Sequence, residues 1–133
     1  MPTTAPDANP SLALYWDFEN LHASLCEAKQ EGAYAKAYNR FKVQEPLVDV
    51  LAVMALVASM GPIAINRAYC NWQYFGRYRD VLMHSGMDLV QMFPPGGTAK
   101  NGADIRLCLD ATEDVGRFSH ISTVVVVGGD SDY

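Results

Sequence analysis

The chain lacks the features that place a protein in a membrane, crosslink it through disulfides or coat it with positive charge. Its longest apolar segment runs from Leu47 to Met60 and contains an aspartate, whereas a membrane-spanning helix needs about 20 apolar residues. Its three cysteines are odd in number and show no C-x-x-C spacing, so they indicate neither a disulfide framework nor a zinc site. The net charge of −5 argues against generalised electrostatic binding of nucleic acid. We therefore expect a cytoplasmic protein with no membrane partner.

The familiar phosphate-binding loops are missing as well. The sequence contains no G-x-G-x-x-G, and residues 96–101 lack the G-K-[ST] of a P-loop. The three histidines show no metal-ligand spacing. The sequence therefore offers no motif that would indicate a nucleotide-cofactor enzyme or a histidine-based metal enzyme.

What the chain does contain is a regular alternation of apolar runs and amphipathic segments. Strands are predicted over residues 12–16, 63–69, 87–93 and 123–127, and helices over residues 21–30, 46–60, 74–84 and 103–115. We expect Asn20 to cap the first helix and Pro46 to begin the second. The valine run at residues 123–127 is typical of a strand covered on both faces.

This alternation predicts an α/β fold, a three-layer, Rossmann-like sandwich with a mainly parallel sheet. Residues 1–10 read as a disordered tail, and residues 11–133 as one domain.

Acidic side chains follow the first and the last predicted strands. Asp17 comes directly after residues 12–16, and Asp130 and Asp132 come shortly after the valine run. Side chains beyond the carboxyl ends of parallel strands line a ligand crevice, so we expect these acids to face one spot. Clustered carboxylates repel one another unless a cation joins them, and oxygen ligands suit Mg²⁺ or Mn²⁺. The sequence therefore predicts an acidic metal site.

Each of these acids also has a purely structural interpretation. Asp17 fits a turn or a helix cap, and capping by itself explains Asn20. Asp104 stands at a helix start, where negative charge is favourable, but its place after a Gly-rich loop makes it a candidate third ligand. Asp110 lies six residues later, about 240° around the helix, and ranks lower. Positive side chains that could hold a substrate phosphate are Lys100, Arg67 and Arg106.

Three blocks carry a resemblance to a known family. They are Asp17-Phe18-Glu19-Asn20-Leu21, then Lys100-Asn101-Gly102-Ala103-Asp104-Ile105 continuing to Leu107 and Asp110, then Gly128-Gly129-Asp130-Ser131-Asp132-Tyr133. In this order they resemble the NYN domains, a branch of the PIN-like nucleases, and within them the LabA-like group. The resemblance implies a metal-dependent ribonuclease that hydrolyses RNA phosphodiester bonds. It implies Mg²⁺ or Mn²⁺ ligands at Asp17, Asp104 and Asp130, supported by Asn20, Asp132 and Asp110.

The resemblance is incomplete in its last block. Gly128 replaces a serine and Tyr133 a phenylalanine, and family members continue with a further helix and strand. We therefore expect a truncated domain, belonging to a longer protein or completed by a homodimer. Two other functions stay open. One is a non-catalytic RNA-binding or regulatory NYN module. The other is a HAD-like phosphatase, which Gly129-Asp130-Ser131 matches in part, although Glu19 and Asn20 depart from its pattern.

Overall fold

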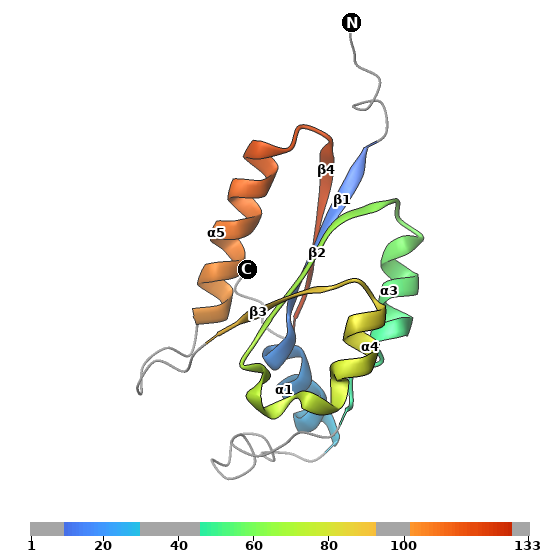
Figure 1. Ribbon diagram of the computed structural model, residues 1–133, viewed down its shortest axis with the longest axis vertical. Coiled ribbons are helices and arrows are strands. Elements are labelled where there is room, and N and C mark those ends of the chain that lie inside the picture. The colour runs from blue at the N-terminus through green and yellow to red at the C-terminus, as the bar shows by residue number, and fades with distance from the viewer. Residues whose placement is uncertain (1–9, 30–45, 93–101, 129–133) are drawn as a thin grey trace, which may run out of the picture.

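A computed structural model of the chain describes residues 10–29, 46–92 and 102–128. These ranges contain a parallel sheet in the order β3-β2-β1-β4, as Figure 1 shows. The strands are β1 (Ser11–Asp17), β2 (Ile63–Cys70), β3 (Asp88–Gln91) and β4 (Ile121–Val127). The predicted parallel α/β fold is therefore confirmed.

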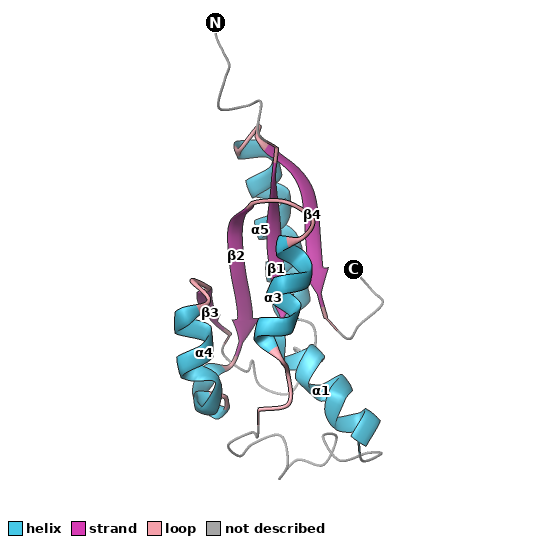
Figure 2. Cartoon of the chain, turned by 90° about the vertical axis from the view of Figure 1, so that its right-hand side faces the viewer, coloured by secondary structure: helices cyan, strands magenta, loops and turns pink. Residues whose placement is uncertain are grey.

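Helices cover both faces of the sheet and complete three layers. They are α1 (Phe18–Lys29), α3 (Val50–Ala58), α4 (Arg79–His84) and α5 (Gly102–Arg117). Helix α5 lies on one face, whereas α3 and α4 lie on the other, as Figure 2 shows. Within the described residues, no helix combines the length and the apolar character that crossing a membrane requires.

The order of the strands creates one special place at the edge of the sheet. The chain moves outward from β1 through β2 to β3, and α5 then returns it to the other side of β1 as β4. The order thus reverses between β1 and β4. In open α/β sheets, ligands bind beyond the carboxyl ends of the strands at such a reversal. A ligand site is therefore expected at the end of β1.

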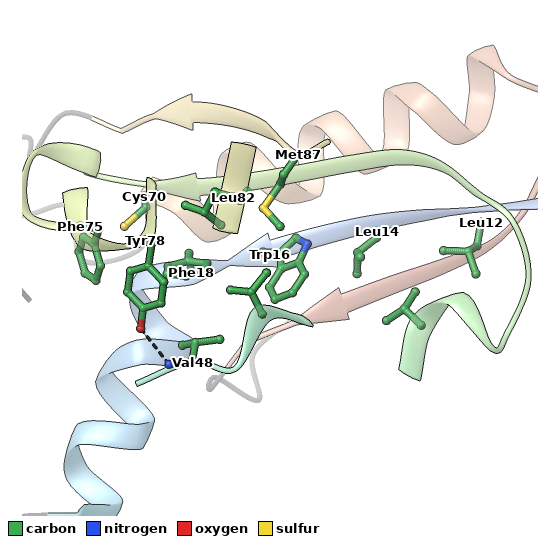
Figure 3. Close-up of a cluster of buried hydrophobic side chains, with 13 residues drawn as sticks. Leu12, Leu14, Trp16, Phe18, Val48, Cys70, Phe75, Tyr78, Leu82 and Met87 are labelled. Carbon is green, nitrogen blue, oxygen red and sulfur yellow. Dashed lines mark hydrogen bonds between the residues drawn. The ribbon is translucent and has the colours of Figure 1, made fainter. Parts of the chain in front are cut away.

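The face that carries α3 and α4 is held mainly by apolar packing. Alternate residues of β1 point into it, and Leu12, Leu14 and Trp16 are almost completely buried there. Figure 3 shows these side chains together with the aromatic rings of Phe18 and Phe75. The alternation of the strand therefore produces this core, as the sequence pattern predicts.

One polar contact ties the segment before α3 to the short turn before α4. The hydroxyl oxygen of Tyr78 accepts hydrogen bonds from the backbone N–H groups of Leu47 (2.7 Å) and Val48 (2.8 Å), the second of which Figure 3 draws. The same hydroxyl lies 3.2 Å from Nδ1 of the buried His22. The Tyr78 hydroxyl therefore joins α1 to both of these segments.

Two helix starts differ from the prediction. The first helix begins at Phe18, directly after β1, so the prediction that Asn20 caps it is wrong. The second begins at Val50 rather than at Pro46, because the side chain of Asp49 caps it by accepting a hydrogen bond from the backbone N–H of Ala52 (3.0 Å). A side-chain cap of this kind satisfies a backbone donor that the first turn leaves unpaired.

The other two differences concern a helix and a strand. Residues 74–84 do not form one helix, since two 3₁₀ turns, Trp72–Tyr74 and Gly76–Tyr78, precede α4. The valine strand β4 is not covered on both faces in the described part of the chain, where Val124 is 42% exposed. Its place at the margin of the described sheet explains that exposure.

Candidate functional site

Asp17 is the last residue of β1 and occupies the reversal point of the sheet. Its side chain is only 1% exposed. Because side chains alternate along a strand, Asp17 lies on the same face of the sheet as Ala13 and Tyr15. Helix α5 covers this face. In register, Asp17 lies opposite Tyr69 of β2. A carboxylate this well buried requires specific stabilisation of its charge.

Helix α1 supplies part of that stabilisation. Asn20 is the third residue of the helix, and its Nδ2 donates a hydrogen bond to Oδ2 of Asp17 at 2.6 Å. Asp17 also directly precedes the helix, where the positive end of the helix dipole favours a negative charge. The spacing D-x-x-N is therefore explained physically, because one helical turn brings the amide back to the carboxylate.

The end of β2 brings a buried thiol, Cys70, near the carboxylates of Asp17 and Glu19. Burial raises the pKa of the Cys70 thiol well above its ordinary value, and the negative charges of Glu19 and Asp17 raise it further. Both carboxylates therefore lie within electrostatic reach of Cys70. The thiol therefore stays protonated at neutral pH in the metal-free protein, which makes it a weak nucleophile.

The remaining predicted acids are described only in part. Asp104 belongs to the first turn of α5, one turn before Leu107, which packs against the sheet; its side chain lies outside the described part. Because α5 leads from the end of β3 back to the start of β4, this first turn lies at the same edge of the sheet as Asp17. Asp130, Asp132 and Lys100 fall outside the described residues.

The register of β4 nevertheless shows where the chain leads. Val127, the last residue of β4, lies opposite Trp16, the neighbour of Asp17. Asp130 follows Val127 by three residues in the sequence. Among the described side chains, no group of three or more His, Cys, Asp or Glu residues could hold a metal ion. The convergence of the three aspartates thus stays a prediction.

The structure places Arg67 in a polar network between the sheet and α5. Its Nη1 donates a hydrogen bond to Oδ2 of Asp114 at 2.9 Å, and the hydroxyl of Tyr15 donates to the same oxygen at 2.8 Å. Burial disfavours the charged guanidinium, but interactions with Tyr69 and Asp114 outweigh this effect and raise the pKa of Arg67. Arg67 therefore has a structural partner in Asp114, and its predicted contact with a substrate phosphate stays a prediction.

Asp110 belongs to the same network, one turn closer to the site. The hydroxyl of Tyr69 donates a hydrogen bond to its Oδ2 at 2.7 Å, and Arg106 Nε lies 3.2 Å from the same atom. Burial raises the pKa of both Tyr15 and Tyr69 well above the ordinary tyrosine value, and hydrogen bonds to the aspartates raise it further. Because Tyr69 lies opposite Asp17, this contact ties α5 to the strand pair that carries the site.

Sequence reasoning missed Asp114 and the two tyrosines. The only signal in the sequence is that Asp110 and Asp114 are four residues apart on one helix, which places them on the same helix face, and that each of two strands carries a tyrosine. The network joins α5 to β1 and β2.

Comparison with known proteins agrees with this architecture. A family model for the NYN domain matches residues 11–133, which is nearly the whole chain. Searches of curated proteins and of solved structures returned no match.

Proposed function

Because the chain belongs to the NYN domain family, whose members are generally PIN-like nucleases, we propose that it is a metal-dependent ribonuclease that hydrolyses RNA phosphodiester bonds. The observation that carries the proposal is the position of Asp17. It is a buried carboxylate at the carboxyl end of the central strand β1, at the reversal point of a parallel sheet. The finer identity as a LabA-like protein stays a prediction.

The donor chemistry of this site fits a divalent cation. Asp17 offers carboxylate oxygens, which are hard ligands and favour Mg²⁺ or Mn²⁺ over softer metals. We propose that Asp104 and Asp130 complete the ligand set, with Asp132 in support. When bound, the metal would lower the pKa of a water molecule and neutralise charge on the scissile phosphate.

The described residues have defined tasks in this proposal. The amide of Asn20 fixes the orientation of the Asp17 carboxylate through its 2.6 Å hydrogen bond. Burial of Asp17 keeps bulk water from competing for its oxygens. Arg106 is half-exposed on α5, where its Nε also contacts Asp110, and we propose that Arg106 and Lys100 bind a substrate phosphate. The contacts of Asp110 to Tyr69 and Arg106 give it a supporting role in holding α5.

The first prediction tests the site through metal binding and cleavage. The parent chain should bind Mn²⁺ and cleave a labelled single-stranded RNA, and a chelator should stop the cleavage. Asp17→Asn should lower Mn²⁺ affinity and the rate by more than about 100-fold, and Asn20→Ala by about 10- to 100-fold, as for residues that orient metal ligands. Titration calorimetry and gel assays give both quantities. The matched control is Asp88→Asn. Asp88 is exposed and begins β3, at the amino end of the strand and away from the site, so this variant should change neither Mn²⁺ affinity nor the cleavage rate.

Other outcomes would point elsewhere. Equal activity of the parent and Asp17→Asn would show that the site is misplaced. Bound metal and bound RNA without any cleavage would indicate an RNA-binding module. Trapping of an aspartyl-phosphate analogue at Asp17 with beryllium fluoride would indicate a phosphatase.

A further inference from the structure

The segment that follows β2 runs beside the proposed site. Tyr69 lies opposite Asp17 in the sheet, so residue 71 is only two residues further along. The ring of Trp72 lies 5.2 Å from the ring of Phe18, centroid to centroid, and Phe18 directly follows Asp17. Figure 1 shows residues 71–79 at the end of the sheet where α1 begins. Residues 71–79, which we name the aromatic–basic segment, therefore start at the same end of the sheet as Asp17.

The backbone of the aromatic–basic segment is firmly attached. Phe75 and Tyr78 are at most 2% exposed and point into the core, as Figure 3 shows. The indole Nε1 of Trp72 donates to the carbonyl of Val90 at 3.0 Å, and its backbone N–H donates to Oε1 of Gln91 at 3.1 Å. The surface that this segment presents is therefore preorganised, which lowers the entropic cost of binding.

The segment also presents partly exposed aromatic side chains, which pack against the core, and exposed positive side chains. Trp72 and Tyr74 are half-buried, whereas Arg77 and Arg79 are exposed. Aromatic faces accept stacked bases, and guanidinium groups bind phosphates, which together are how proteins hold single-stranded nucleic acid. A chain with a net charge of −5 and acids at its site repels RNA overall. Local arginines beside the site counter that repulsion.

We propose that the aromatic–basic segment holds single-stranded RNA next to Asp17, with Trp72 and Tyr74 stacking on bases and Arg77 and Arg79 binding phosphates. The inference rests on the proposed function and adds to it the binding surface and the strandedness of the substrate. A duplex does not fit this surface, because its stacked bases are not available to aromatic side chains.

The second prediction measures binding without cleavage. Anisotropy of a labelled single strand of about 12 nucleotides is recorded with the full chain and a chelator at several salt concentrations. Arg77→Ala/Arg79→Ala should weaken binding at least about tenfold and reduce the salt slope by about 1.4, since each phosphate contact contributes about 0.7. Arg77→Lys/Arg79→Lys should keep most of the binding. Arg117→Ala, an exposed arginine in the last turn of α5, should leave it unchanged.

A second variant separates stacking from charge. Tyr74→Leu keeps an apolar side chain against the core but removes the aromatic face, so it should weaken single-strand binding about tenfold with no change in salt slope. Duplex RNA of the same sequence should bind more weakly and respond little to Tyr74→Leu. Melting temperatures of all variants should match the parent.

The outcomes separate this inference from the proposed function. If the arginine and Tyr74 variants bind RNA as the parent does, while the parent still cleaves RNA and Asp17→Asn does not, the inference is overturned and the ribonuclease stands. Equal binding of duplex and single strand, unaffected by Tyr74→Leu, overturns it too. If the parent neither binds nor cleaves single-stranded RNA, both fall.

Discussion

The two faces of the sheet differ in the balance of apolar packing and directional polar contacts. On the face with α3 and α4, β1 contributes Leu12, Leu14 and Trp16 to a core of aliphatic and aromatic side chains. Its aromatic rings contact one another edge to face, as Phe18 and Tyr78 do at 4.8 Å. The stabilisation from such packing is roughly proportional to the apolar area that it buries, and it depends little on direction.

The face with α5 combines a smaller apolar cluster with a directional network. Ala13, Leu107 and Ile121 pack there, but two aspartates of α5 also accept hydrogen bonds from Tyr15 and Tyr69. Hydrogen bonds and ion pairs depend on position and angle far more than apolar contact does. We infer that they fix the register of α5 along the sheet. The register matters because α5 carries position 104 in its first turn, at the edge where Asp17 lies.

The third prediction breaks the network at its most buried point. Asp114 is 5% exposed and serves both Tyr15 and Arg67. Asp114→Ala removes the carboxylate that Tyr15 and Arg67 share and leaves the guanidinium only the more distant Asp110, 3.9 Å away, so it should cost about 3 kcal/mol of unfolding free energy in urea. The neighbouring Glu113, 72% exposed and 3.8 Å from Arg117, is the matched control, and Glu113→Ala should cost less than about 1 kcal/mol. Equal costs for the two would mean that packing alone holds α5.

The fourth prediction applies the same test to the apolar face. Leu82 of α4 is 1% exposed, and Leu82→Ala should cost about 3 kcal/mol through lost burial and a residual cavity. Met83, next in sequence and 65% exposed, is the control, and Met83→Ala should cost less than about 0.5 kcal/mol. Urea unfolding again measures both. A Leu82 variant as mild as the Met83 variant would contradict a packed core on this face.

Sequence patterns predicted the fold well because strands and helices here are local signals. Each of the four described strands lies within two residues of its predicted start, and the apolar runs explain why. Helix starts were less predictable, since Asn20 and Pro46 are both plausible starts by residue type alone. Strand β1 is followed by α1 without an intervening turn, and no residue type in the sequence indicates this direct transition.

In the candidate site, too, some features could be predicted from the sequence and others could not. The position of Asp17 at the carboxyl end of β1 was predictable because an acid directly after a buried strand has a fixed place in a parallel sheet; its role as a ligand stays a prediction. The partner of Arg67 was not, because Asp114 is 47 residues away and meets it only through the register of α5 on the sheet. Tyr15 and Asp114 are separated by 99 residues. Contacts over such distances depend on packing, which periodicity does not determine.

The last prediction concerns pH and has the smallest effect. Burial and the hydrogen bond to Asp110 raise the pKa of Tyr69 above its ordinary value near 10, so the folded protein keeps this phenol proton to higher pH than the unfolded chain does. The stability that this proton provides is fully present below pH 10 and is lost as the pH rises above it.

Tyr69→Phe removes this group from the pH dependence and keeps its ring. Between pH 10 and 12, the free energy of unfolding of the parent should fall more steeply than that of Tyr69→Phe, by up to about 1.4 kcal/mol per pH unit. Burial also raises the pKa of Tyr78 on the opposite face, but Tyr78 is present in both proteins and cancels in the difference. Urea unfolding at several alkaline pH values gives the two slopes. Identical slopes would mean that Tyr69 ionises equally in the folded and unfolded states, and that its hydrogen bond to Asp110 does not hold α5 to β2.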